Sequence, residues 1–300
     1  TVALSTSGTA TEGTDYTDGS GNVDDIVISA GSTTGTVSFT PTDDSIYDAT
    51  SNETATIAVS GVSGGSATES GSQSVTITIT DNESAPTVTL SRSAAAIDED
   101  SSSTVTITAT LSNGTYQDVT VSIDGTGGTG TEGTDFGTVS DITISAGSTT
   151  GTATVDPTDD SVYEGDETAG ISISGVSGGS ATESGSQSVT VTITENESAP
   201  TVTLTSSASS INENAGSSLT LTATLSGAVD ETVTVTIGTA GTSTEGTDYT
   251  DGSGAVDDIT ISAGSTTGTV NFTPTDDSIY EGDETAIISI DGVSGGDASE

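Results

Sequence analysis

The chain has 300 residues, of which 45 are acidic and one, Arg92, is basic, so its formal net charge is -44. It contains no Lys, His or Cys, which removes the usual general bases, Schiff-base amines and thiol nucleophiles, and we therefore expect no enzymatic activity. Nucleic acids and anionic membrane surfaces are disfavoured as partners because both attract basic proteins. No stretch approaches the roughly 20 apolar residues of a membrane-spanning helix, which predicts no membrane insertion.

Near-identical motifs recur along the chain and divide it into units. The sequence SAPTVTL occurs at residues 84–90 and 198–204, which gives a period of 114 residues from Pro86 to Pro200. The motif TEGTD begins at positions 11, 131 and 244. A unit of this length is a common domain size. We predict a complete unit at 86–199, a partial unit at 1–85 that lacks its first strands, and a unit at 200–300 that lacks its last strand, as in a segment of a longer array.

Hydrophobic alternation predicts strands within the complete unit. In TVTITATL, residues 104–111, every second residue is apolar and Thr lies between, as in a strand with one buried face. Seven strands are predicted, at about 86–91, 104–111, 118–123, 141–145, 150–155, 168–174 and 188–194. Short alternating strands, Gly-rich and Ser-rich turns and no helical period predict an all-β fold of antiparallel β-sandwiches.

Acidic residues gather in four segments of the complete unit, each at a predicted strand end or in a loop. The segments are IDED (97–100), GTDF (133–136), DDSVYEGDE (159–167) and TENE (194–197). If they converge at one pole of the sandwich, six to eight carboxylates repel one another unless a cation joins them. Calcium takes six to eight oxygen ligands, and the lack of His and Cys disfavours zinc and copper. The sequence therefore favours Ca²⁺ as the cofactor.

Each acidic motif also has a plainer interpretation. An acidic loop is commonly a solvated face, and this alternative stays open for DDSVYEGDET. The segments DGSGNVDD (18–25) and DGSGAVDD (251–258) are better explained as polar hairpin insertions, because the complete unit shortens them to GTVSD. The segment GTGTEG (128–133) matches the sequence pattern of a dinucleotide-binding motif but not its structural context, since no helix is predicted after it.

The ordered set I-x-E-x, GTDY or GTDF, DDSVYEGDE and ITENE resembles the Calx-β domain family over the whole complete unit and parts of both neighbours. The resemblance implies tandem immunoglobulin-like sandwiches that bind calcium at one end, next to the junction with the following domain. The ligands it implies for the complete unit are Glu99, Asp135, Asp159, Asp160, the Val162 carbonyl, Glu164, Glu195, Asn196 and Glu197, with Glu167 as a weaker candidate.

The same resemblance implies ligands in the partial units. In the first unit these are Asp15, Asp43, Asp44, Ile46, Asp48, Asp81, Asn82 and Glu83. In the third they are Glu213, Asp248, Asp276, Asp277, Ile279, Glu281 and Glu284. Two departures from the family pattern weaken these sites. The terminal motif carries Asn where the family has Asp, and in the first unit DATSNET replaces EGDET, which leaves Asp48 in place of Glu164 and shifts Glu53 by two residues.

These features predict a structural function. Only Ser198, Ala199 and Pro200 separate TENE from the next strand, a connector too short and stiff for free swivelling. We expect a calcium-rigidified extracellular rod, stalk or filament of a secreted or surface adhesin, with calcium ions and homotypic filament or matrix contacts as partners. Two alternatives stay open, a calcium-sensing regulatory module and a surface-binding adhesive repeat for glycan or ice. The Thr-x-Thr faces could themselves bind an ordered surface.

Overall fold

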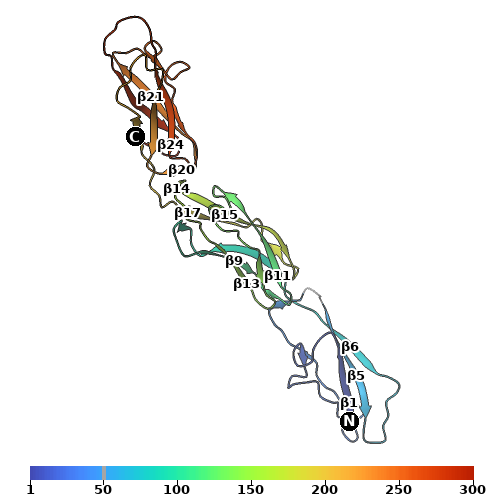
Figure 1. Cartoon of the computed structure of the whole chain (residues 1–300). Coiled ribbons are helices and arrows are strands. Elements are labelled where there is room, and N and C mark those ends of the chain that lie inside the picture. Colours follow the sequence, from blue (N-terminus) through green and yellow to red (C-terminus); the bar gives the residue numbers. More distant parts are fainter. Residues whose placement is uncertain (49–51) are drawn as a thin grey trace.

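The computed structural model describes residues 1–48 and 52–300, which form three β units arranged end to end along an elongated molecule (Figure 1). We call them the first, second and third units, with the boundaries predicted above. The described residues form strands, turns and loops, and they include no helix long and apolar enough to cross a membrane.

The second unit is a sandwich of a five-stranded and a four-stranded sheet, with strand orders β12-β11-β15-β17-β8 and β13-β9-β7-β16. Most pairs are antiparallel, but β8 lies parallel to β17 and β16 parallel to β7. The strands are β7 (Thr87–Arg92), β8 (Ala96–Asp98), β9 (Val105–Leu111), β10 (Gly114–Thr115), β11 (Val119–Gly128), β12 (Ile142–Ile144), β13 (Thr150–Val155), β14 (Val162–Tyr163), β15 (Glu167–Ser177), β16 (Thr182–Glu183) and β17 (Ser188–Thr194).

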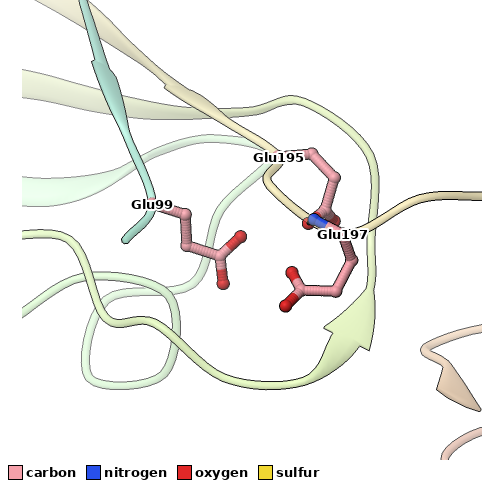
Figure 2. Close-up of side chains that lie close together, drawn as sticks. All are labelled: Glu99, Glu195 and Glu197. Carbon is pink, nitrogen blue, oxygen red and sulfur yellow. The ribbon is translucent and has the colours of Figure 1, made fainter. Parts of the chain in front are cut away.

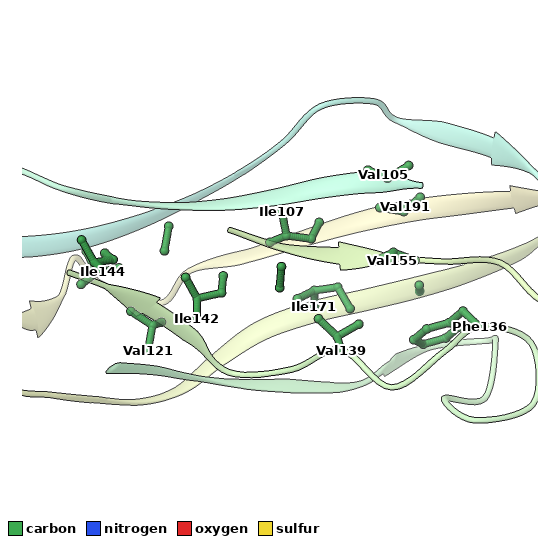
Figure 3. Close-up of a cluster of buried hydrophobic side chains, with 14 of the residues drawn as sticks. Val105, Ile107, Val121, Phe136, Val139, Ile142, Ile144, Val155, Ile171 and Val191 are labelled. Carbon is green, nitrogen blue, oxygen red and sulfur yellow. The ribbon is translucent and has the colours of Figure 1, made fainter. Parts of the chain in front are cut away.

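The core of the second unit lies between its two sheets and is built from alternate residues of each strand (Figure 3). In β9 the side chains of Val105, Ile107, Ala109 and Leu111 are buried, and the Thr residues between them are half-buried. Figure 3 shows Phe136 at one end of this core. The period of two in the sequence thus becomes one buried face per strand.

The first and third units repeat parts of this architecture. The first has the sheets β1-β5-β6 and β2-β3 and the third has β18-β19-β24-β22 and β23-β21-β25. The strands are β1 (Val2–Gly8), β2 (Tyr16–Thr17), β3 (Thr40–Pro41), β4 (Ile46–Tyr47), β5 (Glu53–Val62), β6 (Ser74–Ile79), β18 (Val202–Ser206), β19 (Leu219–Leu225), β20 (Ala228–Val229), β21 (Val233–Gly241), β22 (Tyr249–Thr250), β23 (Ile259–Ile261), β24 (Thr267–Pro274) and β25 (Ala286–Ser294).

Neighbouring units are joined by short strand pairs as well as by the chain itself. At the first junction β4 lies parallel to β10, and at the second β14 lies parallel to β20. In both cases the strand of the preceding unit comes from its acidic loop, DDSIY or DDSVY. The acidic loop of one unit is therefore hydrogen-bonded to the next unit.

All seven predicted strands occur, with differences at their ends. The strands β11 and β15 extend beyond the predicted 118–123 and 168–174, because the added residues still pair with the other strand. Gly127 and Gly128 of β11 pair with the start of β15, and residues 175–177 of β15 pair with the start of β11. Four short strands, β8, β10, β14 and β16, were not predicted. They hold two or three residues each, too few to show an alternating pattern.

Candidate metal centre

Glu99, Glu195 and Glu197 form what we call the terminal cluster, in which one carboxylate oxygen from each residue lies within 4.8 Å of the others (Figure 2). Strand pairing explains this convergence. The last residue of β8, Asp98, is paired with the last residue of β17, Thr194. Because parallel strands end at the same edge of a sheet, Glu99 and Glu195 leave it side by side.

Glu99 is buried, with only 7% of its surface exposed. Burial, followed by the charges of Glu195 and Glu197, raises its pKa to about 7. One of its oxygens accepts a long hydrogen bond from the Asp160 amide, at 3.4 Å. A buried carboxylate beside two others is unfavourable unless a positive charge joins it.

Glu195 fastens the terminal motif to the acidic loop. Its Oε2 accepts hydrogen bonds from the amides of Glu164, at 2.6 Å, and Gly165, at 3.0 Å. Its Oε1 accepts two more from the amides of Asn196 and Glu197, each at 2.9 Å. Although burial raises its pKa, the hydrogen bonds from Glu164 and Glu197 outweigh that effect and keep the pKa below its usual value.

A second group, which we call the loop cluster, consists of Asp135, Glu164 and Glu167, again with carboxylate oxygens within 4.8 Å of one another. Burial and then the charge of Asp135 raise the pKa of Glu164 and of Glu167 to about 7. Asp135 is held by a hydrogen bond from the Thr131 amide to its Oδ2, at 2.5 Å. The TEGTD motif thus fixes one oxygen of Asp135 and turns the carboxylate toward the acidic loop.

Gly128 allows the TEGTD loop to approach Glu167. It ends β11 with φ of +107°, and a Cβ at this position would collide with the Thr168 carbonyl. The chain therefore needs glycine where β11 passes the start of β15.

The other predicted ligands of the second unit lie around the two clusters but outside them. Asp160 Oδ1 accepts a hydrogen bond from the Val162 amide at 2.6 Å, and Asp159 Oδ1 accepts one from Asn196 Nδ2 at 3.2 Å. Val162 itself lies in β14 and is paired with Ala228 of the third unit. Glu167, predicted as the weaker candidate, is a full member of the loop cluster.

The third unit reproduces the loop cluster with more exposed residues, whereas Glu213, the equivalent of Glu99, groups with residues of the acidic loop. Glu213, Asp277 and Glu281 form one group and Asp248, Glu281 and Glu284 the other. Asp276 and Ile279 lie outside these groups, and Ile279 is 64% exposed.

In the first unit the predicted ligands surround a cavity of about 70 Å³, and among the described carboxylates of this unit no three converge as in the others. The lining includes Asp15, Asp44, Ile46, Asp48, Asp81, Asn82 and Glu83. Asp43 lies next to it and accepts a hydrogen bond from Asn82 Nδ2 at 3.1 Å. Part of the altered segment DATSNET, residues 49–51, lies outside the described residues.

Glu53 is a candidate ligand that the sequence reasoning missed. It pairs with Ile79 as Glu167 pairs with Ile193, so the two glutamates occupy equivalent sheet positions despite the shift of two residues in the sequence. Burial and then the charges of Asp15 and Asp48 raise its pKa. The signal available in the sequence was the dipeptide Glu-Thr, which recurs at 53, 167 and 284.

The donor set of the second unit fits calcium. Every side-chain donor in the two clusters is a carboxylate oxygen, as calcium prefers. Glu197 Oε2 is enclosed and has no hydrogen-bond partner within the described ranges, 1–48 and 52–300. The one basic side chain, Arg92, donates to the Ala95 carbonyl at 3.3 Å, and it forms no ion pair in the described part of the chain. A cation from solution would supply the missing positive charge.

Comparisons with known proteins identify the domain family of the chain. The model of the Calx-beta domain family matches residues 1–83, 81–197 and 195–299. No match was found among curated proteins.

Among solved structures, CBD12 from CALX1.2 is 21% identical, with a TM-score of 0.30 over 60% of this chain and 72% of that chain. The calcium binding domain CBD12 of CALX1.1 is 22% identical, with a TM-score of 0.32 over 61% of this chain and 74% of that chain. Invasin, a bacterial integrin-binding protein, is 15% identical, with a TM-score of 0.32 over 97% of this chain and 57% of that chain.

Proposed function

This chain belongs to the Calx-beta domain family, as a tandem array of immunoglobulin-like β-sandwiches, and from that premise we propose that it is a calcium-binding structural segment. The observation that carries the proposal is the terminal cluster. Glu99 is 7% exposed beside two other glutamates, and Glu197 Oε2 is enclosed without a partner among the described residues. Carboxylates held in this way gain stability when a divalent cation neutralises them.

Different residues have different roles in this proposal. Glu99 and Glu197 of the terminal cluster, and Asp135, Glu164 and Glu167 of the loop cluster, would hold calcium. Glu195 already accepts four amide hydrogen bonds, so it mainly positions the acidic loop and the terminal motif. Bound calcium supplies the positive charge that these like-charged groups lack.

The junctions support a rod as the mechanical form of the segment. The loop that carries Glu164 also pairs with the third unit through β14 and β20, and the linker of Ser198, Ala199 and Pro200 is short. An ion that orders the loop would thereby also restrict the joint. The end-to-end arrangement of the units is consistent with this form (Figure 1).

We place this rod outside the cell, as part of a secreted or surface-attached adhesin or matrix protein. Calcium-binding modules of extracellular proteins commonly have dissociation constants of about 10⁻⁴–10⁻³ M, and we expect the sites of this segment to lie in that range. The strong negative charge would keep neighbouring rods apart. The role is structural, with no catalytic step.

The test is a pair of measurements on the full chain in millimolar calcium and after calcium removal. Thermal unfolding should show a higher Tm with calcium, and the double variant Glu99→Gln/Glu197→Gln should lose most of this shift. Small-angle scattering should show a narrower distribution of end-to-end distances with calcium.

Each part of the proposal can fail separately. An unchanged Tm would contradict calcium binding. A raised Tm with an unchanged distance distribution would contradict the rod and favour a sensing module. Magnesium at the same concentration is the control for ionic strength.

A further inference from the structure

Asp230 of the third unit lies beside the metal centre of the second unit. The parallel pair of β14 and β20 sets Val162 opposite Ala228 and Tyr163 opposite Val229. Continued by one residue, this register sets Glu164 opposite Asp230. The Asp230 amide donates a hydrogen bond to the Tyr163 carbonyl at 3.4 Å, which keeps the two chains together up to this point.

The two carboxylates share one cavity. Glu164 and Asp230 both line a cleft of about 490 Å³ at the junction, together with Tyr163 and Glu231. This volume accommodates an ion with several water molecules, each of which takes about 30 Å³. Because Glu164 belongs to the loop cluster, an ion bound there would lie next to this cleft and its water.

Electrostatics agrees with this placement. Burial, then the charge of Glu231, then the charges of Asp135 and Glu195 raise the pKa of Asp230. Conversely, Asp230 is among the charges that raise the pKa of Glu164 and Glu167. Asp230 thus faces the loop cluster across the junction and adds a negative charge to it.

The first junction has a different residue at the equivalent position. Aligning GTYQ (114–117) with AVDE (228–231) sets Tyr116 at the position of Asp230. The Tyr116 hydroxyl donates a hydrogen bond to Asp44 Oδ2 at 2.7 Å. At the first junction the following unit therefore gives the acidic loop a hydrogen-bond donor, whereas at the second it adds a further oxygen acceptor.

We propose that Asp230 completes the calcium site of the second unit from the third unit, as a ligand that crosses the junction. The buried Glu99 and the enclosed Glu197 Oε2 belong to the neighbouring terminal cluster, and they favour a cation at the same pole of the unit. The site then requires two consecutive units, and calcium binding couples them directly. This inference rests on the proposed calcium-binding function.

The experiment is a calorimetric calcium titration of the full chain, of Asp230→Asn and of the matched control Glu231→Gln. Both variants remove one negative charge from the same cleft. Glu231 Oε2, however, accepts a hydrogen bond from the Gly296 amide of its own unit at 3.1 Å. We expect Asp230→Asn to weaken the tightest class of sites about tenfold, because ligand charge tunes calcium affinity, and Glu231→Gln to change it less than about twofold.

A second readout separates a ligand from a structural residue. In calcium-free buffer Asp230→Asn should unfold at the same or a higher Tm than the unmodified chain, since it removes a repulsive charge. With calcium it should unfold at a lower Tm. Equal affinities for the two variants, or a lower Tm of Asp230→Asn in both buffers, would overturn the inference. Absence of calcium binding by the unmodified chain would instead overturn the proposed function.

Discussion

Tyr163 and Asp297 meet across the junction between the second and third units, where the Tyr163 hydroxyl donates a hydrogen bond to Asp297 Oδ2 at 3.2 Å. Tyr163 also packs against the core of the third unit. Tyr280, at the equivalent position of the next acidic loop, is 96% exposed. The tyrosine of the acidic loop therefore acts as a junction contact where a following unit covers it.

Replacing Tyr163 by Phe should loosen the second junction without unfolding either unit. It removes one hydrogen bond, worth about 0.5–1.5 kcal/mol, and leaves the ring in place. We expect a broader scattering distance distribution and a nearly unchanged Tm. Tyr280→Phe is the control, because the exposed Tyr280 has no junction contact to lose. An equal broadening in both variants would show that the Tyr163 hydroxyl does not hold the junction.

The pH dependence of stability should change sign with calcium. In the calcium-free chain, the pKa of Glu99, Glu164 and Glu167 is raised to about 7 from 4.5, chiefly by burial. The folded state then binds more protons than the unfolded chain between these values, so stability is largest below about pH 4.5 and is lost as pH rises through 7. Thermal unfolding of calcium-free protein should give a higher Tm at pH 5 than at pH 8.

In saturating calcium the order should reverse, because protons compete with the ion for the same oxygens. Glu99→Gln should reduce the dependence in the calcium-free chain, since residue 99 then no longer titrates. Glu69→Gln is the control, because it makes the same chemical change in the first unit, outside both clusters of the second unit. A Tm that rises from pH 5 to pH 8 without calcium would contradict the assigned protonation of these glutamates.

The fold of this chain follows closely from its sequence, whereas the grouping of its ligands does not. The strict alternation in β9 required no tertiary information, because each apolar residue specifies one face of a strand. The separation into a terminal and a loop cluster depends on β8, a strand of three residues, whose parallel pairing with β17 brings Glu99 to Glu195. A sequence motif predicts neither this strand pairing nor the four amide hydrogen bonds by which Glu195 positions the acidic loop and the terminal motif.

The second unit should bind calcium more tightly than the first. The loop cluster brings together Asp135, Glu164 and Glu167, and no such convergence occurs among the described carboxylates of the first unit. There, the Tyr116 hydroxyl also occupies Asp44 Oδ2. Asp135→Asn should therefore remove most of the calcium-dependent rise in Tm of the full chain, and the equivalent Asp15→Asn should remove little. The reverse order would place the tighter site in the first unit.

Gly128→Ala tests whether the approach of β11 to β15 positions the loop cluster. Gly128 has φ of +107° and an added Cβ would collide with the Thr168 carbonyl, whereas at Gly133, with φ of +88°, no atom lies within 4 Å of an added Cβ. Gly133→Ala should therefore cost only backbone strain, on the order of 1 kcal/mol. Gly128→Ala adds a steric clash that forces the strands apart and moves Asp135 away from Glu167. We expect Gly128→Ala to lower the Tm more than Gly133→Ala does and to weaken calcium binding in calorimetry. Similar losses in both variants would show that backbone strain alone explains the need for glycine at position 128.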